Sequence, residues 1–357
     1  MKTQRLLPIS LFLLLWWWSL PVLSQAKTDS LLQRLSAPSL TVDEEIALCE
    51  QLAAAYIYSN FGQSRMYAKR GLALAHKSGK QKDEGMLYRH LSVAYELNGI
   101  ADSSRLCKLR MLSIGRETGD EALENLAIFY LGNGCYATSS FDSAIYYYQK
   151  ALPYYERTDE AKANAIRANI GTVYVVLGVY DKAKPYFIEA YDVARRLNDK
   201  PTLGQVCHEL HTICQRQGQY EEALRYAQEA VAIFREADRP YHLAVSLQAL
   251  VLEYERRREF DKAIPLAEEG IRIAELHGYT TTLSGSELSL GSCYVETGQY
   301  SKAIPHLDRA LAYADTTDLR HLVNIYESMH KQAVMTGDKA AAIDYHDMET
   351  GLLERLA

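Results

Sequence analysis

The sequence predicts an all-α solenoid built from a repeated pair of helices. A small residue recurs along the chain at steps of 39 or 40 residues, and each interval holds two stretches with the apolar spacing of a helix. The recurring positions are Ser64, Ser104, Ala144, Ala183, Ala223, Ala263, Ala303 and Ala342. One such unit buries its apolar face only against its neighbours, so the sequence predicts an array of about eight units over residues 43–357.

The first 24 residues differ from the array and are expected to be a secretory signal peptide, 1–24. Lys2 and Arg5 precede an apolar run that extends to Leu23, and Val22 and Ser24 fit a cleavage site before Gln25. We therefore expect an exported protein, periplasmic or secreted, with no membrane insertion after cleavage. An uncleaved signal would leave the protein signal-anchored, since this run is about long enough to span a bilayer.

Residues 25–42 form a short leader before the first repeat, and its apolar residues predict one extra helix that shields the first edge of the array. Within the array, the stretches 165–177 and 182–197 are expected to be paired helices separated by Gly178 and Val179. Asp181 is placed as the N-cap of the second helix, and Pro185, Pro265 and Pro305 are placed in the first turn of their second helices, where a missing N–H is tolerated.

The best copy of the repeat resembles the tetratricopeptide repeat (TPR). The residues that carry the resemblance are Gly171, Tyr174, Gly178, Tyr180, Ala183, Phe187 and Ala190. The resemblance implies a right-handed superhelical solenoid of helix-turn-helix repeats whose first helices line a concave face. Gly132, Gly171 and Gly291 recur at position 8, inside a helix where glycine costs about 1 kcal/mol, which implies a close approach between helices.

The eighth copy departs from this pattern. It has His330 at position 8 and Glu349 at position 27, which we interpret as the polar face of a capping repeat. An apolar stripe of Tyr345, Met348 and Leu352 continues to Leu356; it either packs on the eighth repeat or stays open for a partner.

The charge balance argues against nucleic acid as a partner. The net charge is −6, and removal of Lys2 and Arg5 with the signal makes it −8. The single basic run, at Arg256, Arg257 and Arg258, falls at a turn and fits a solvated turn better than an anion site.

Six cysteines in an exported protein suggest disulfides, but the spacing of Cys207 and Cys214 on one helix, about 10.5 Å along its axis, does not allow a bridge. Cys207, His211 and Cys214 share a helical face that zinc would accept, yet they occupy packing positions and lack a fourth ligand. We therefore expect core packing, with His211 hydrogen-bonded internally, and no metal.

No catalytic motif is found, so the sequence predicts a non-enzyme without a cofactor. Glu209 and Glu255 are interpreted as ordinary helix-surface residues. An enzyme within the helical array stays as an alternative that an activity dependent on Cys207, His211 or Cys214 would support.

The resemblance implies a binding surface on the concave face, at positions 2, 5, 6, 9, 12 and 13 of each first helix. The candidate residues are Arg89, His90, Phe129, Tyr130, Asn133, Tyr136, Asn169, Thr172, His208, Thr212, Gln215 and Gln248. Amides can hold a peptide unit through donor and acceptor while rings hold apolar side chains, so an extended peptide fits. Phe129 stands where chaperone-binding relatives have a lysine, which argues against capture of a terminal carboxylate.

The function expected from the sequence is a non-catalytic, exported scaffold that binds a protein or peptide partner. The export signal and 40-residue repeats resemble the sensory ectodomains of bacterial sensor histidine kinases and membrane regulators, so sensing for such a regulator is one role. Two alternatives remain: a free-standing cell-envelope scaffold without ligand sensing, and a shortened sensor ectodomain. Both are considered because neither a transmembrane helix nor an output domain is expected after Ala357.

Overall fold

The structure, a computed structural model, describes residues 25–57 and 59–356, and every regular element in these ranges is an α-helix. The signal peptide expected over residues 1–24 lies outside the described residues. The described chain forms two compact units, an N-terminal unit of residues 25–178 and a C-terminal unit of residues 179–356. No helix in these ranges has both the length and the apolar character needed to cross a membrane.

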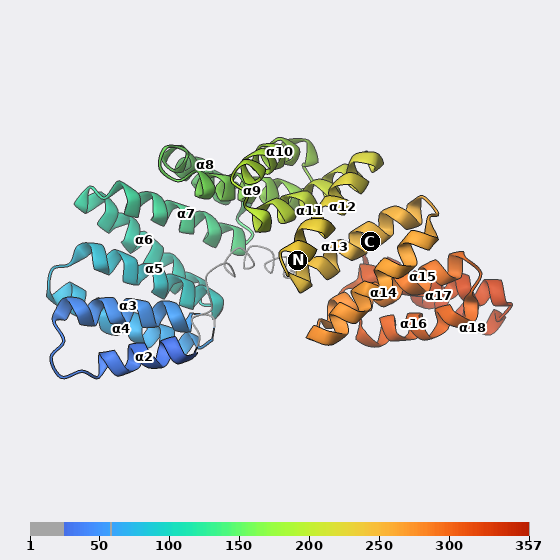
Figure 1. The fold of residues 1–357 in the computed structure, drawn as a ribbon, viewed down its shortest axis with the longest axis horizontal. Helices are drawn as coiled ribbons and strands as arrows, with labels where there is room; N and C mark the ends of the chain where they lie inside the picture. Colours follow the sequence, from blue (N-terminus) through green and yellow to red (C-terminus); the bar gives the residue numbers. More distant parts are fainter. Residues whose placement is uncertain (1–24, 58, 357) are drawn as a thin grey trace. The chain divides into compact units, whose positions relative to one another are not determined.

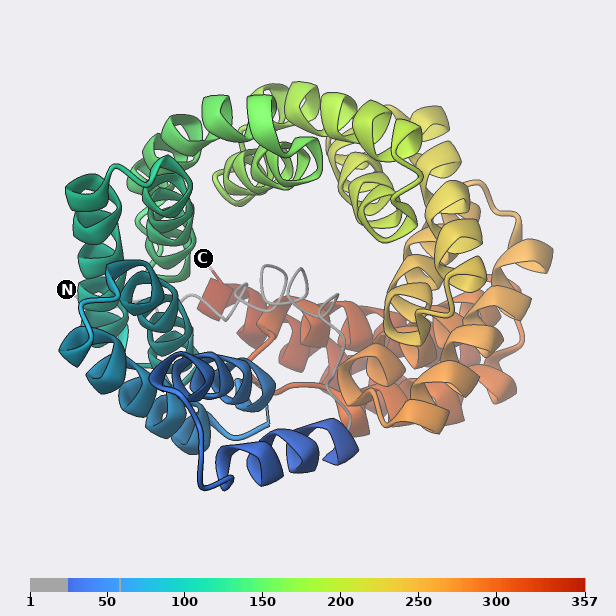
Figure 2. The same cartoon turned by 60° about the vertical axis from the view of Figure 1, so that its left-hand side comes forward.

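The N-terminal unit consists of antiparallel helices that follow one another in chain order (Figure 1). They are α2 (Gln25–Leu35), α3 (Val42–Tyr56), α4 (Phe61–Lys77), α5 (Gln81–Leu97), α6 (Ala101–Thr118), α7 (Glu121–Ala137), α8 (Phe141–Thr158) and α9 (Glu160–Val176). Consecutive helices contact each other, and α5 also contacts α3 and α7, so the first helices of successive repeats lie side by side (Figure 2). The leader helix α2 packs on α3 through buried Leu31.

The C-terminal unit repeats the same arrangement. Its helices are α10 (Tyr180–Arg196), α11 (Lys200–Arg216), α12 (Tyr220–Glu236), α13 (Pro240–Arg256), α14 (Phe260–His277), α15 (Thr280–Glu296), α16 (Tyr300–Tyr313), α17 (Leu319–Thr336) and α18 (Lys339–Leu356). Here α15 contacts both α13 and α17 in addition to its chain neighbours. The predicted all-α repeat fold is confirmed.

The recurring small residues lie where neighbouring helices pack most closely. Seven of the eight are at most 2% exposed, and only Ala342 of the last repeat is partly exposed. In the first repeat the position is filled by Ser64, whose hydroxyl donates a 2.8 Å hydrogen bond to the carbonyl of Ala53 on the facing helix. A serine is therefore accepted in place of alanine because its polar atom is satisfied.

The turn between the two helices of a repeat contains one residue with a positive φ angle, in the left-handed region of backbone conformation. These residues recur at the same interval of about 40 positions as the small residues. These residues are Gly99, Ser139, Gly178, Gly218, Arg258, Gly298 and Gly337. The second helix starts at the aromatic position soon after this turn, so α10 begins at Tyr180 with Val179 as its N-cap. The prediction of Asp181 as the cap is therefore wrong. Pro185, Pro265 and Pro305 each lie in the second turn of their helices, not the first.

The glycines at position 8 make room for a side chain of the second helix. A Cβ atom at Gly132 would lie 2.7 Å from the ring of Tyr148, and one at Gly291 would lie 2.7 Å from the side chain of Leu307. The expected close approach is confirmed at both positions. The atoms that come close belong to a residue one turn after the recurring alanine.

Candidate functional site

The structure divides the predicted binding residues between the two units, and the first-helix surface of each unit is described separately. In the N-terminal unit Arg89 and His90 lie on α5, Asn169 and Thr172 lie on α9, and α7 carries Phe129, Tyr130, Asn133 and Tyr136. His90, Tyr136 and Asn169 are each only 5% exposed. They form the layer beneath the surface, which corrects the expectation that all of these side chains line it.

The two asparagines support a buried tyrosine. The Tyr148 hydroxyl donates a 2.8 Å hydrogen bond to Oδ1 of Asn133 and also interacts with the side chain of Asn169. Tyr148 itself is fully buried against Gly132. Asn169 is thus buried beneath the surface, whereas Asn133 stays partly exposed and shares its Oδ1 atom with the core.

Arg89 is held in place from below. Its Nη2 atom lies 2.8 Å from Nε2 of His90 and 3.8 Å from Oε1 of Glu50 on α3. Burial lowers the pKa of His90 although its Nε2 atom also lies 3.4 Å from Oε1 of Glu50, and a neutral ring can accept a hydrogen bond from the guanidinium. The guanidinium is thus positioned but still partly exposed.

A second cation approaches the same surface from α9. The ammonium of Lys162 lies 4.8 Å from the ring centre of Tyr155 and 5.6 Å from that of Phe129, within the range of cation–π attraction. Phe129 in turn packs edge-on against Tyr130. We call Arg89, Phe129, Tyr130, Tyr155 and Lys162 the basic–aromatic cluster.

The electrostatics of this cluster favour an anion. Burial lowers the pKa of Lys162, the nearby carboxylate of Asp159 partly offsets this, and the positive charge of Arg89 lowers it further. Burial raises the pKa of Tyr130 although its ring is partly exposed. Within residues 25–57 and 59–356, no carboxylate comes within ion-pair distance of the Lys162 ammonium. Glu50 and Asp159 offset part of the positive charge of Arg89 and Lys162, and a further negatively charged group would reduce the remaining repulsion between these partly buried cations.

Sequence reasoning missed Lys162 and Tyr155. Neither lies at a position that the repeat pattern assigns to the binding face, since Tyr155 is on a second helix and Lys162 is in the first turn of α9. Lys162 supplies a cation beside Phe129, the position where the family's chaperone-binding members carry a lysine.

In the C-terminal unit, His208, Thr212 and Gln215 lie on α11 and Gln248 lies on α13, and all four are partly exposed. Three of them use polar atoms inside the unit. Gln248 Nε2 donates to the Thr282 carbonyl at 2.6 Å, Gln215 Nε2 donates to Glu253 Oε1 at 3.4 Å, and Thr212 Oγ1 donates to the His208 carbonyl at 3.1 Å. These side chains therefore stabilise contacts within the unit through their hydrogen bonds.

Two carboxyl groups of this unit differ from ordinary surface residues. Burial raises the pKa of Glu209 and of Glu255 to about 7, and Glu255 accepts a hydrogen bond from the Cys293 thiol at 3.2 Å. Burial, with nearby His211 and His242, lowers the pKa of His208 to about 4. The interpretation of both glutamates as solvated helix-surface residues is therefore wrong, because they lie partly buried on the first helices.

The packing interpretation of Cys207, His211 and Cys214 is confirmed. Both cysteines are fully buried and burial raises the pKa of each thiol, while His211 Nε2 lies 3.1 Å from Glu253 Oε1. One different group of metal-ligating side chains does come together in the described residues. It comprises His330, His346 and Glu349 in the last helix pair, where sequence analysis expected no metal.

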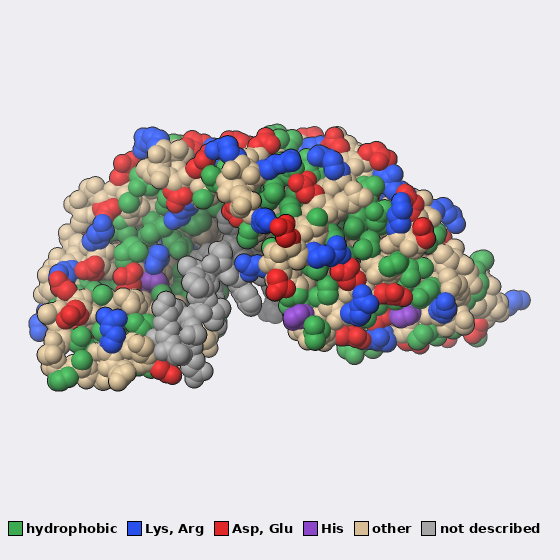
Figure 3. Space-filling model, viewed as in Figure 1, with side chains coloured by type: hydrophobic (Ala, Val, Ile, Leu, Met, Phe, Trp, Pro, Cys, Tyr) green, Lys and Arg blue, Asp and Glu red, His purple; other side chains and the backbone are tan. Residues whose placement is uncertain are grey.

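Charged side chains of both signs are interspersed over the face of the molecule drawn in Figure 3. This distribution differs from the basic stripe that a nucleic-acid-binding surface carries.

Comparison with known proteins agrees with the repeat. Two models of the tetratricopeptide repeat match residues 204–275 and 288–320. These matches identify tetratricopeptide repeats within the C-terminal unit, and the paired helices of the described chain follow the same pattern. A search of curated protein sequences gives no significant match.

Several solved structures share the fold. The apo form of the quorum sensor NprR from B. thuringiensis is 14% identical, with a TM-score of 0.64 over 90% of this chain and 91% of that one. A Rap protein complexed with competence and sporulation factor is 15% identical, with a TM-score of 0.56 over 93% and 92%. The apo form of RapI is 14% identical, with a TM-score of 0.58 over 76% and 98%. At this identity the likeness concerns the fold.

Proposed function

We propose that this chain is a non-catalytic scaffold that binds an acidic segment of a partner protein or peptide on the first-helix surface of its N-terminal unit. The observation that carries the proposal is the basic–aromatic cluster, in which Arg89 and Lys162 lie around three aromatic rings. The guanidinium and ammonium offer charge-assisted hydrogen bonds to a carboxylate, and the rings offer contact area to the neighbouring apolar side chains of the segment.

The structurally similar proteins support a role in recognition. One is described as a quorum sensor and another was solved as a complex with competence and sporulation factor. Export through the expected signal at residues 1–24, and a role as the sensing part of a system with a membrane sensor or regulator, belong to the same proposal. A structural cell-envelope scaffold without ligand sensing is the alternative, and it predicts partner binding that is indifferent to the cluster.

Binding of short labelled peptides tests the proposal. The probes are fluorescein-labelled peptides of random apolar sequence that carry two aspartates, two asparagines or two lysines, measured by fluorescence anisotropy. We expect the aspartate peptides to bind best, with an affinity that falls as salt rises. The variant Arg89→Gln, Lys162→Gln should lose about 10-fold or more of that affinity, because each charge-assisted hydrogen bond contributes about 1.5–3 kcal/mol.

The chain offers a matched control. Lys150 on α8 also lies over an aromatic ring, that of Tyr146 at 5.9 Å, but on the second-helix side of the same unit. Lys150→Gln should leave the anisotropy titration unchanged. Equal binding of aspartate and asparagine peptides, or unchanged binding by the double variant, would overturn the assignment of this surface.

A further inference from the structure

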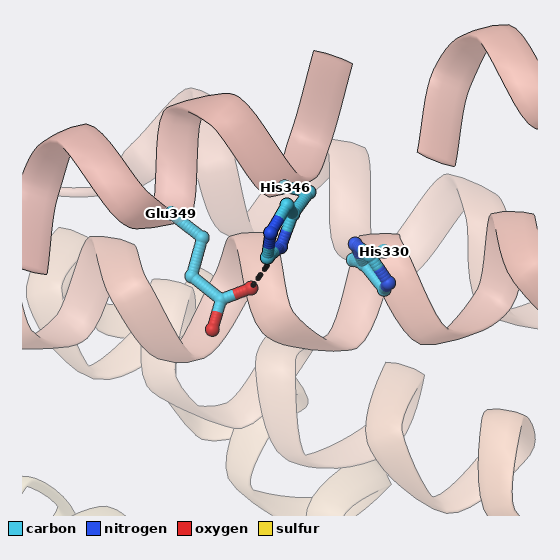
Figure 4. A group of neighbouring side chains, drawn as sticks. All are labelled: His330, His346 and Glu349. Atoms are coloured by element: carbon cyan, nitrogen blue, oxygen red, sulfur yellow. Dashed lines mark ion pairs between the residues drawn. The ribbon is translucent and has the colours of Figure 1, made fainter. Parts of the chain in front are cut away.

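We propose that His330, His346 and Glu349 form a binding site for a divalent transition metal ion, with Zn²⁺ as the natural occupant, that joins α17 to α18. The two histidines come from different helices of the last pair, and Glu349 follows His346 by one helical turn (Figure 4). One ligand atom from each residue lies within 4.8 Å of the other two. This site is independent of the basic–aromatic cluster, which lies in the other unit.

The residue types fit the ion. Neutral imidazole and carboxylate are the ligands of open zinc sites, in which three protein ligands leave a fourth position for water. Tetrahedral bonds of about 2.0–2.1 Å would hold the ligand atoms roughly 3.4 Å apart. The His346 Nδ1 atom and the Glu349 Oε2 atom are now 4.0 Å apart, and both residues are on the accessible side of α18, so side-chain rotation alone can close the site.

His330 carries a polar atom that no protein group satisfies. Its Nδ1 atom is buried and has no hydrogen-bond partner in the structure. Its ring centre lies 5.1 Å from that of His346, so the two imidazoles face a common region. A buried polar atom without a partner normally costs stability, and a histidine is unusual at a repeat position that Gly132 and Gly291 fill elsewhere in the chain.

The last helix buries few of its own side chains. Leu352 is the only buried residue of α18, with Tyr345 partly buried against the core, whereas Met348 and Leu356 of the predicted apolar stripe are 49% and 42% exposed. The remaining helices of the C-terminal unit each bury three or more residues. A metal ion bound from both helices would tie α18 to α17 at a point where apolar burial is sparse.

Zinc titration of the full chain, purified without a histidine tag and stripped with chelator, tests the site. We expect one Zn²⁺ per chain by isothermal titration calorimetry, with a dissociation constant of about 10 μM or tighter. Co²⁺ used in place of Zn²⁺ should give visible absorption bands of a four- or five-coordinate ion. Saturating Zn²⁺ should raise the thermal unfolding midpoint, since a ligand of the folded state stabilises it.

Two variants test whether these side chains bind the ion. His346 and Glu349 are accessible enough to replace without unfolding the chain, so His346→Ala and Glu349→Gln should each weaken Zn²⁺ binding by about 10-fold or more and remove the cobalt bands. His277→Ala, at an exposed histidine of α14, is the matched control and should bind as the wild type does. Absence of zinc binding, or binding that survives His346→Ala, would overturn the proposal.

Discussion

His211 and Glu253 form a buried pair that links successive repeats. The Nε2 atom of His211 on α11 lies 3.1 Å from the Oε1 atom of Glu253 on α13, and the two residues are 4% and 0% exposed. Gln215 adds a weaker contact to the same carboxylate oxygen. The pair explains why a histidine is tolerated at a position that other repeats fill with glycine, because its Nε2 atom has a partner although His211 Nδ1 and Glu253 Oε2 have none.

Removing one member of this pair should be costly. We expect His211→Ala to lower the free energy of unfolding by about 3–5 kcal/mol, because it leaves a carboxylate buried without its main partner. The double variant His211→Leu, Glu253→Met should lose much less, since neither polar group remains. Urea denaturation of the three proteins checks this, and a double variant as unstable as His211→Ala would contradict it.

Gly132 and Gly351 should respond in opposite ways to the same substitution. Gly132→Ala brings a Cβ atom to 2.7 Å from the Tyr148 ring, so we expect a loss of about 1–3 kcal/mol. Gly351→Ala adds a Cβ atom with nothing within 4 Å inside α18, so we expect a gain of roughly 0.5–1 kcal/mol. Thermal unfolding distinguishes the two, and a loss at both positions would show that space around Gly132 is not the cause.

The partly buried carboxyl groups should make stability depend on pH. The pKa of Glu209 and of Glu255 is about 7 in the folded chain and about 4.5 in the unfolded chain. The stability that comes from protonating them in the folded state is therefore fully present below pH 4.5 and is lost as the pH rises through 7. His208, with its pKa lowered from 6.5 to about 4, acts in the opposite direction over an overlapping range. The pH dependence of each glutamate variant must therefore be compared with that of the wild type, so that the contribution of His208 cancels.

Glu209→Gln and Glu255→Gln should each be more stabilising at about pH 8 than at about pH 5, because glutamine removes the buried negative charge. Glu354→Gln on the exposed face of α18 serves as the control and should show no such trend. Melting temperatures at the two pH values measure the effect. A difference that is the same at both would mean that neither carboxyl titrates in this range.

The cysteines should be unreactive in the folded protein. None of the six, all of which lie in the described residues, forms a disulfide, and five are buried. Burial raises the pKa of Cys49 and of Cys107 to about 11, which leaves little thiolate at neutral pH. We expect a thiol reagent to label Cys135 first and the other five only in denaturant, as mass spectrometry of labelled peptides would reveal; fast labelling of Cys207 in native protein would contradict this.

The helical pairs could be predicted because their determinants are local. The recurring small residue, the aromatic that follows the turn and the apolar spacing all lie within one repeat, and each is found where expected. The start of α10 was misplaced because the left-handed turn ends the preceding segment early enough for the helix to begin at Tyr180. A good capping residue at Asp181 does not outweigh that turn.

The binding residues were predicted less well because exposure depends on neighbouring repeats. Asn169 matches the family position but is covered, whereas Lys162 matches no position and reaches Phe129 from another helix. The metal ligands were missed for a similar reason. His330 and His346 lie at nearly equal distances on either side of the turn at Gly337, which brings them together although they are 16 positions apart.

Several side-chain hydrogen bonds between neighbouring repeats of a unit join residues 34 to 42 positions apart, as in His211–Glu253 and Arg235–Glu269. Each repeat therefore carries both halves of its connection, one for the repeat before it and one for the repeat after it. A duplicated 40-residue segment could enter such an array and find its partners without breaking any pair already present. Chains of this design can thus lengthen or shorten by whole repeats during evolution while the chemistry of each surface is inherited intact.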